Sequence, residues 1–183
     1  MKVLIMLSGG VESTALLHYA KECNYEVECV HVIWNNKTQR EANHAARIAD
    51  YYGVPYSELN MKSGEFQGKY HNVARRDSLW WGCGLLTYAP IGGYNEVWYG
   101  AHCDEISPVA LGPAGVTLLL RSVNCDTDVK CPMFHMSKVD QWNTLPQEVK
   151  KLLVTCNNPG KDGKPCGICE KCIEWKSFAI NAQ

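Results

Sequence analysis

The sequence predicts an α/β fold built on a doubly wound parallel sheet, followed by a smaller cysteine-rich C-terminal lobe. Two observations predict it. In the first third of the chain, apolar runs of strand length alternate with segments whose apolar residues recur at helical spacing. Near the C-terminus, four cysteines surround a loop rich in glycine, proline and asparagine. A strand–helix–strand order favours parallel strands joined by right-handed crossovers.

The first elements follow in order from this spacing. Residues 2–7 form an apolar run with the length of a buried strand, and residues 27–33 form a second one. Between them, one helical face carries Ala15, Leu16, Tyr19, Ala20 and Cys23. A second helix ends at Gly53, and residues 54–56 then open a third strand. This second helix carries, on one face, Ala42, Ala45, Ala46, Ala49 and Tyr52.

The later elements are less regular. A third helix is expected from residue 77 to about residue 89, and residues 96–100 form another buried strand. The stretch 107–124 fits either a strand or a helix, so its structure stays open. A last strand is expected at residues 129–135, with Ser137 capping a short helix after it.

Composition indicates an ordinary globular protein. The chain has 183 residues, 46% of them apolar, which suits one main domain at residues 1–145 with a lobe at residues 146–183. Ten cysteines without a signal peptide favour a reducing cytoplasm. No apolar stretch approaches the roughly 20 residues that a membrane-spanning helix needs. The net charge of −1 and the pI of about 6.6 argue against nucleic acid as a partner.

The charges of the C-terminal tail mix both signs. Its lysines, among them Lys171, are interleaved with carboxylates that include Glu170 and Glu174. Such mixing is typical of a solvated face.

The cysteines of the tail, Cys156, Cys166, Cys169 and Cys172, follow the pattern C-x9-C-x2-C-x2-C. Four thiolates complete the tetrahedral coordination of zinc and leave no open position, so the pattern predicts a structural zinc site. The intervening residues 157–165 are almost all turn-forming and bury no apolar core of their own. A bound metal ion would hold this loop in place. The alternative is a disulfide pair or reactive thiols.

The turn after the first strand, Ser8-Gly9-Gly10, has the features of a phosphate cradle. It lies beyond the carboxyl end of a parallel strand, where ligands bind in such sheets. Two glycines let the backbone approach an anion, and the following helix offers unpaired N–H groups at its start. Ser13 and Thr14 add hydroxyl donors. The turn lacks the Walker and dinucleotide sequence patterns. The alternative is that the two glycines are present only because the backbone of the turn requires them.

These motifs resemble those of a known family. The segment from Ser8 to Ser13 resembles the SGGxDS pyrophosphate loop of the ATP pyrophosphatase (PP-loop) superfamily, whose fold is adenine nucleotide alpha hydrolase-like and Rossmann-like. The cysteine cluster resembles the zinc site of the 7-cyano-7-deazaguanine synthases of queuosine biosynthesis. Four further segments match that family in the same order: Trp34 to Thr38 with Glu41, Val73 to Asp77, Gly100 to Glu105, and Cys131 to Lys138. The chain resembles a short variant of this family.

The resemblance implies an ATP-dependent carbon–nitrogen ligase. In this family ATP, with Mg²⁺, adenylates the carboxylate of 7-carboxy-7-deazaguanine, ammonia displaces AMP to give the amide, and a second ATP leads to the nitrile. The implied nucleotide-binding residues are Leu7, Ser8, Gly9, Gly10, Val11, Glu12, Ser13 and Thr14. The implied catalytic residues are Arg76, Asp104, Glu105 and Lys138. The zinc is structural, and a homodimer is a further expectation.

The chain departs from the family pattern at several points. Glu12 and Glu105 stand where aspartates are expected, which changes the reach of a magnesium ligand. Residues 107–112 replace a Tyr-Pro-Asp-Cys segment, and Trp175 replaces an arginine. These changes bear on substrate choice more than on the fold.

Other functions therefore stay open. One is another PP-loop adenylating enzyme: an amide-stopping sibling, a ligase that conjugates a deazaguanine, or a tRNA sulfurtransferase. The second is a non-catalytic zinc-ribbon protein that binds nucleotides.

Single residues also allow two interpretations. Lys138 could contact phosphates or begin a solvated helix, and either Arg75 or Arg76 could pair with an anion. His102 could touch substrate or lie hydrogen-bonded at the core edge. Trp34 could stack on a base or pack in the core.

Overall fold

Strands and helices alternate along the part of the chain that the structure describes. The computed structural model describes residues 1–33, 36–61, 85, 88–104, 112–160 and 164–181. The strands are β1 (Lys2–Met6), β2 (Glu26–Ile33), β3 (Tyr56–Asn60), β4 (Glu96–Trp98) and β5 (Asp128–Lys130). The helices are α1 (Val11–Glu22), α2 (Asn36–Tyr52), α4 (Gly112–Ser122), α5 (Lys138–Thr144), α6 (Gln147–Lys150) and α7 (Glu170–Asn181).

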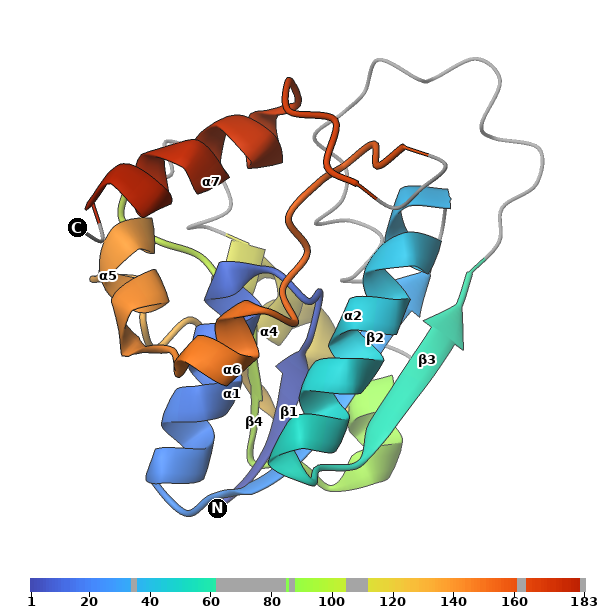
Figure 1. Cartoon of the computed structure of the whole chain (residues 1–183). Helices are drawn as coiled ribbons and strands as arrows, with labels where there is room; N and C mark the ends of the chain where they lie inside the picture. The colour runs from blue at the N-terminus through green and yellow to red at the C-terminus, as the bar shows by residue number, and fades with distance from the viewer. Residues whose placement is uncertain (34–35, 62–84, 86–87, 105–111, 161–163, 182–183) are drawn as a thin grey trace.

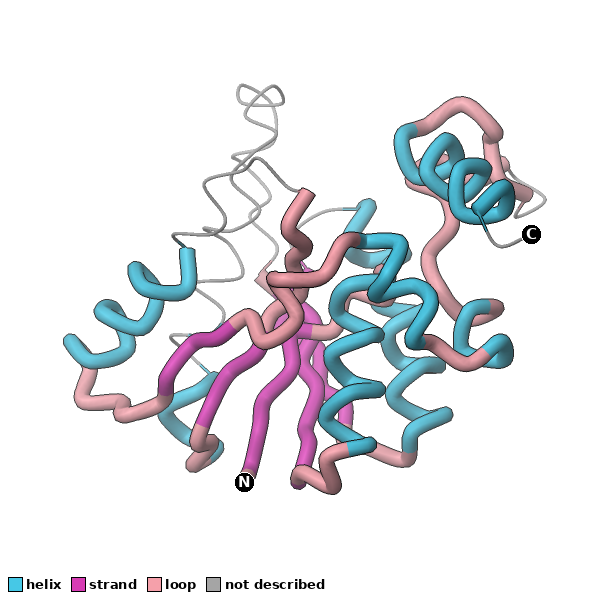
Figure 2. Tube along the Cα trace, turned by 90° about the vertical axis from the view of Figure 1, so that its left-hand side faces the viewer, coloured by secondary structure: helices cyan, strands magenta, loops and turns pink. Residues whose placement is uncertain are grey.

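The five strands form one parallel sheet in the order β3-β2-β1-β4-β5. Helices cover both of its faces, as Figure 2 shows from the side. The chain moves outward from β1 to β3 and then continues on the other side of β1 with β4 and β5, so the strand order reverses between β1 and β4. Ligands bind beyond the carboxyl ends of the strands at such a reversal. The predicted doubly wound parallel sheet is confirmed.

The central strand β1 is buried on both faces, because successive side chains of a strand point to opposite sides. Val3 and Ile5 lie in one apolar cluster with Leu16 of α1 and Ile48 of α2. Leu4 lies in a second cluster on the opposite face, with side chains of β4 and α4. A strand between two helical layers needs a continuous apolar run, which the start of the chain supplies.

Three stretches can be compared with the elements expected from the sequence. β5 ends at Lys130 and does not continue to residue 135, so the predicted length of this strand was wrong. Pro132 has no backbone N–H for a neighbouring strand, and the chain turns there, with Phe134 N donating to Cys131 O. The stretch that fitted either element contains helix α4. Of the helix expected at residues 77–89, the described residues 85, 88 and 89 are helical and the rest lies outside the described part.

The chain after β5 packs against α1 and then rises to the carboxyl side of the sheet. Ser137 caps α5 as predicted, its Oγ accepting from Asp140 N. Val149 of α6 and Leu153 after it are buried in the cluster that contains α1. In Figure 1, α7 then lies above α5. The division between residues 1–145 and 146–183 stays a prediction. Among the described helices, none combines the length and the hydropathy needed to cross a membrane.

Candidate functional site

The turn Ser8-Gly9-Gly10 follows β1 at the point where the strand order reverses. Gly9 has a φ of +76°, a backbone conformation that is costly for residues with a Cβ atom. A Cβ atom at Gly9 would also lie 3.0 Å from the Cβ of His44 and 3.2 Å from the backbone N of Ala45. The backbone angle and the packing of α2 therefore both require glycine at this position.

Hydroxyl groups fix the turn onto the first turn of α1. The backbone N of Ser8 donates to Ser13 Oγ at 3.1 Å, and the two hydroxyl oxygens of these serines also lie 3.1 Å apart. Thr14 Oγ1 donates to Gly10 O at 2.7 Å. Gly10 begins the helix without a side-chain cap. The N–H groups of the first turn can therefore serve an anion.

A cavity of about 160 Å³ opens beside this turn. The ends of β1 and β2, together with α1, α2 and the residues after β4, line it, including Leu7, Ser8, Glu12, His31, Glu41 and Gly100. Gly100 approaches α1 closely, since a Cβ atom there would lie only 2.6 Å from the backbone N of Ser13. The residues after β4 thus press directly on the first turn of α1.

Two buried polar side chains, His31 and Glu41, line the inner wall of the cavity. His31 is 4% exposed, and its two ring nitrogens lie 2.8 Å from Leu7 O and Thr38 O, which ties the end of β1 to α2. Glu41 pairs with Lys171 of α7, with 3.2 Å between Oε1 and Nζ. The sequence offered no sign of the role of His31, because a single histidine within a strand forms no pattern.

Lys138, the first residue of α5, reaches the turn from the opposite side. Its Nζ lies 2.9 Å from Glu12 Oε1 and 2.9 Å from Glu174 Oε2. Burial raises the pKa of Glu12, but the charge of Lys138, its hydrogen bond to Glu12 and smaller contributions from the backbone and His102 together outweigh this effect and hold the pKa below its ordinary value. Burial likewise lowers the pKa of Lys138, and the carboxylates of Glu12 and Glu174 outweigh it, so this pKa lies above its ordinary value. Both shifts favour the charged forms at neutral pH.

His102 and Asp104 stand at the outer edge of the same site. His102 Nε2 lies 3.7 Å from Glu12 Oε1, and its Nδ1 lies 3.7 Å from Asp104 Oδ2. Asp104 also accepts a hydrogen bond from the backbone N of Lys138 at 3.3 Å. The structure therefore brings Glu12, Asp104 and Lys138 together beside the turn.

Other residues singled out from the sequence lie outside the described part of the chain: Trp34, Arg75, Arg76 and Glu105. The catalytic roles of Arg76, Asp104, Glu105 and Lys138 stay predictions. The nucleotide-binding roles of residues 7–14 do so as well.

The four cysteines of the tail converge on one point. Their Sγ atoms all lie within 4.8 Å of one another, and all four thiols are free of disulfides. The Sγ of Cys156 lies 3.8 Å from that of Cys169, and the Sγ of Cys166 lies 3.9 Å from that of Cys172. A tetrahedral ion with metal–sulfur bonds of about 2.3 Å separates its thiolates by about 3.8 Å. These residues fit a single metal ion, whereas a disulfide would bring two sulfurs to about 2.05 Å.

Backbone N–H groups surround the sulfur atoms. Asn157 N donates to Cys169 Sγ at 3.4 Å, and Cys166 N donates to Cys156 Sγ at 3.3 Å. The hydrogen bond from Asn157 lowers the pKa of Cys169 to about 6. Burial raises the pKa of Cys172 to about 12. A bound cation offsets the cost of ionising such a buried thiol.

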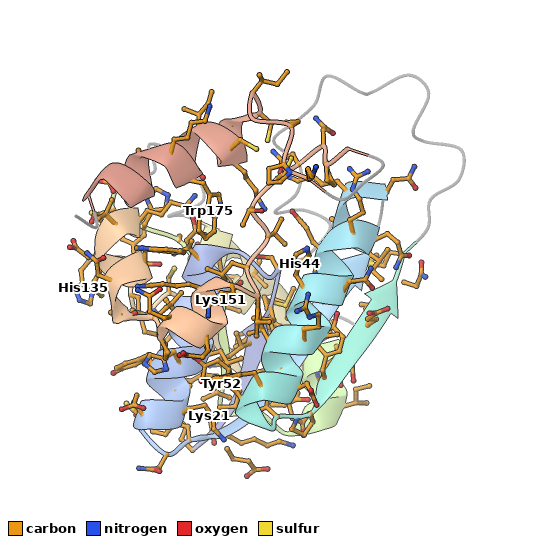
Figure 3. The ribbon with its side chains drawn as sticks, viewed as in Figure 1. Lys21, His44, Tyr52, His135, Lys151 and Trp175 are labelled. Atoms are coloured by element: carbon orange, nitrogen blue, oxygen red, sulfur yellow. The ribbon has the colours of Figure 1, made fainter. Side chains whose placement is uncertain are left out.

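The chain that enters the metal centre is hydrogen-bonded to the turn after β1. Val154 N donates to Gly9 O at 2.9 Å. His44 of α2, labelled in Figure 3, places Nδ1 2.8 Å from Leu152 O. The metal centre and the glycine-rich turn are therefore neighbouring parts of one structure.

Two charges of α7 differ from the expected solvated face. The side chains of Lys171 and Glu174 are 23% and 34% exposed, and they pair with Glu41 and Lys138. The prediction was wrong for these two residues because their partners are distant in the sequence; Lys171 and Glu41 stand 130 positions apart. Local charge spacing carries no information about such pairs.

The parallel sheet, the glycine-rich turn at its strand reversal and the cysteine cluster define a doubly wound α/β protein with a candidate phosphate-binding turn and a candidate metal centre. A family model described as "Queuosine biosynthesis protein QueC" matches residues 2–76. A 7-cyano-7-deazaguanine synthase from Archaeoglobus fulgidus is 22% identical over 99% of this chain and 87% of that protein. One from Marinobacter nauticus is 27% identical over 98% of this chain and 93% of that protein. The resemblance to the 7-cyano-7-deazaguanine synthases is confirmed over nearly the whole chain.

Solved structures share the fold. The U34-tRNA thiolase NcsA from Methanococcus maripaludis, with its [4Fe-4S] cluster, matches 99% of this chain and 66% of its own at 13% identity, with a TM-score of 0.59. A predicted subunit of tRNA methyltransferase from Methanocaldococcus jannaschii matches 79% of this chain and 73% of its own at 12% identity, with a TM-score of 0.58. At these identities the likeness shows the fold alone. Fold and synthase relatives together support an ATP-using PP-loop enzyme.

Proposed function

We propose that this protein is an ATP-dependent ligase that converts 7-carboxy-7-deazaguanine and ammonia to 7-cyano-7-deazaguanine. One observation carries the proposal. The turn Ser8-Gly9-Gly10 stands at the strand reversal beside Glu12 and Lys138, in a chain similar to the synthases over nearly its whole length.

The reaction consists of two activations. In the first, a carboxylate oxygen of the substrate attacks the α-phosphorus of ATP and pyrophosphate leaves. Ammonia then attacks the acyl carbon, AMP leaves and a proton is lost, which gives the amide. In the second, the amide oxygen attacks another ATP in the same way. Loss of AMP and of the two nitrogen-bound protons leaves the nitrile.

The turn after β1 binds the departing pyrophosphate. Two features support this role: the uncapped start of α1 at Gly10 and the hydroxyls of Ser8 and Ser13 on the same side of the turn. Donors that are already in place when charge develops on the leaving group lower the barrier without further reorganisation. Thr14 acts differently, since its hydroxyl holds the carbonyl of Gly10.

Lys138 neutralises charge on the same phosphates. Its ammonium lies 2.9 Å from the carboxylate of Glu12. Because Glu12 belongs to the first turn of α1, Lys138 stands beside Ser8-Gly9-Gly10. Glu12 and Asp104 provide carboxylate oxygens, which are the ligands that Mg²⁺ prefers. Mg²⁺ bound there with ATP would offset the negative charge of the phosphates.

We assign the metal of the cysteine cluster as structural zinc. Four thiolates fill all four tetrahedral positions, so no position remains for a reacting group. The cysteines of an iron–sulfur cluster bind different irons, which spreads their sulfurs wider than around one ion. The 3.8 Å and 3.9 Å sulfur separations therefore favour zinc. Ammonia as the nitrogen source, a homodimer and a cytoplasmic location remain predictions.

A pyrophosphate-release assay tests the proposed reaction. The metal-loaded protein is incubated with Mg·ATP, ammonium and 7-carboxy-7-deazaguanine, and each component is omitted in turn. Pyrophosphate release that requires the deazaguanine acid, with the nitrile identified by mass spectrometry, is the expected result. Accumulation of the amide alone would assign an amide-stopping sibling. No release with this acid would contradict the proposal.

A further inference from the structure

Lys138 is held between two carboxylates that come from opposite ends of the chain. Glu12 belongs to the first turn of α1 and Glu174 to the second turn of α7. Lys138 Nζ lies 2.9 Å from Glu12 Oε1, and 3.1 Å and 2.9 Å from the two carboxylate oxygens of Glu174. The side chains of Lys138 and Glu12 are each 20% exposed, so solvent screens their interaction less than it would on the open surface.

The helix that carries Glu174 is fixed at its start by the metal centre. Cys169 directly precedes α7 and Cys172 lies in its first turn, so two of the four metal ligands set its position and rotation. The next turn is fixed by aromatic packing. Trp175 meets Trp142 of α5 edge-on, with ring centroids 4.5 Å apart, and Figure 3 shows Trp175 on the side of α7 that faces α5.

A third anchor ties α7 to the other side of the nucleotide cavity. Lys171 pairs with Glu41 of α2 at 3.2 Å, while Glu174, one helical turn later, pairs with Lys138 of α5. Glu41 lines the cavity and Lys138 stands beside Glu12, which also lines it. The helix therefore connects the two walls of the site through charged groups of opposite sign.

The two carboxylates around Lys138 are not equivalent. Glu12 lies in the turn that meets the nucleotide, where Mg²⁺ bound with ATP would compete with Lys138 for its oxygens. Glu174 lies on the helix that the cysteines hold, outside the lining of the cavity. It can therefore keep Lys138 in place after Glu12 turns to the metal, while charge develops on the leaving pyrophosphate.

We propose that Glu174 is a positioning residue for Lys138 and that the metal centre acts on the reaction by holding α7. The role of Lys138 in the reaction rests on the proposed function. The hold of Glu174 on Lys138, called the clamp below, is a statement about structure alone. Trp175, which stands where the family has arginine, belongs to the same arrangement because it seats α7 on α5.

Lysine labelling tests the clamp without reference to catalysis. The metal-loaded protein is treated with formaldehyde and borohydride, and methylation of Lys138 is followed by mass spectrometry. Glu174→Ala and Glu174→Gln should raise the labelling rate of Lys138 severalfold, and Glu174→Asp should do so less. Glu170→Gln, which removes an exposed carboxylate from the same helix, is the matched control and should leave the rate unchanged. Labelling of Lys138 that is the same in Glu174→Ala as in the wild type would overturn the clamp.

Removal of the metal tests its part in the clamp. Chelation of the wild-type protein should raise the labelling of Lys138 to the level of Glu174→Ala and should have no added effect in that variant. A rate that does not respond to chelation would show that α7 holds Glu174 without the metal centre, and would overturn that half of the inference.

Turnover kinetics test the positioning role. In the pyrophosphate-release assay, Glu174→Ala should lower kcat about tenfold, because a hydrogen-bonded charged pair is lost. The KM for ATP should stay within about threefold of the wild-type value, because the lost interaction acts in the transition state and not in the binding of ATP. In a Lys138→Met background the same change should cost nothing further. An equal loss in that background, or an unchanged or higher kcat in Glu174→Ala, would overturn the positioning role. If the wild type releases no pyrophosphate, the proposed function fails, and the labelling still decides the clamp.

Discussion

The proposed metal centre and the proposed nucleotide site are built in opposite ways. All four metal ligands come from one short stretch, residues 156–172, and their sulfurs meet through local turns. The proposed nucleotide site draws Glu12 from the start of the chain and Gly100 and Lys138 from later segments, and Glu174 near the C-terminus contacts Lys138 from outside the cavity. The metal centre depends on residues that are close in sequence, whereas the nucleotide site depends on segments that meet only in the folded chain. The two meet where Val154 N donates to Gly9 O and where α7 reaches Lys138.

This difference predicts how each region fails. Loss of one local ligand should empty the metal centre outright, because the remaining thiolates no longer complete a tetrahedron. The nucleotide site should instead weaken in steps, each one set by the contact that is removed.

Loss of a metal ligand should have the largest effect. Cys169→Ser removes one thiolate, so the bound metal should fall to a small fraction of the wild-type content and the C-terminal residues should lose stability. Structural zinc contributes roughly 10–16 kcal/mol of binding free energy in small peptide sites. Metal analysis after dialysis measures the change. Cys23→Ser, which lies at the end of α1 far from the cluster in sequence, is the control and should keep its metal. Unchanged metal in Cys169→Ser would contradict the four-thiolate centre.

Gly100→Ala should have the next largest effect. Its Cβ atom would lie 2.6 Å from Ser13 N and 2.7 Å from the Cβ of Glu12, so β4 and α1 would have to separate. We expect a loss of about 3 kcal/mol of unfolding free energy, together with weaker ATP binding. Urea unfolding and calorimetry with an ATP analogue measure both.

Gly115→Ala is the matched control for that experiment. A Cβ atom at Gly115 would meet no atom within 4 Å, and the residue lies within α4. Alanine should therefore leave the protein as stable or stabilise it by up to about 1 kcal/mol, because glycine is the poorer helix former. Equal losses in the two variants would contradict the close approach at Gly100.

The contrast between the two regions also explains what the sequence could predict. Apolar periodicity predicted the sheet because β1 is buried on both faces, and cysteine spacing predicted the metal cluster because its ligands are local. The end of β5 was misplaced, since apolar residues continue after Lys130 although Pro132 ends the pairing.

Long-range contacts left no local pattern. His31 between Leu7 O and Thr38 O, and the pairing of Glu174 with Lys138, depend on segments that meet only in the folded chain. Lys138 and Asp104 were proposed from a family resemblance and not from spacing. The fold then places them beside Glu12.

Ser8→Ala should weaken the nucleotide site without emptying the metal centre. The hydroxyl lies 3.1 Å from Ser13 Oγ and accepts from Gly10 N, and its loss should lower ATP turnover about tenfold, equivalent to about 1.4 kcal/mol. The unfolding free energy and the metal content should change little. Ser57→Ala on β3 is the control for loss of a hydroxyl and should retain turnover. Full activity in Ser8→Ala would place the phosphates elsewhere.

Acid should remove the smallest increment of stability. The folded-state pKa of Glu12 is lowered because burial, which raises it, is outweighed by the charge and hydrogen bond of Lys138 together with smaller lowering effects. The contribution of Glu12 to stability is therefore present above its ordinary pKa of 4.5 and is lost as the pH falls through the lower folded-state value. Glu12→Gln should be less stable than the wild type by about 1 kcal/mol at neutral pH, with the difference vanishing in acid. A difference that persists unchanged in acid would show that it does not come from charge.

The most direct test is a crystal structure of the metal-loaded protein with Mg²⁺ and a nonhydrolysable ATP analogue. We expect the β- and γ-phosphates to lie on the N–H groups and hydroxyls of Ser8-Gly9-Gly10 and Ser13, with the ammonium of Lys138 directed at them and Glu174 still bound to it. A triphosphate bound away from this turn, or a turn blocked by neighbouring side chains, would contradict it.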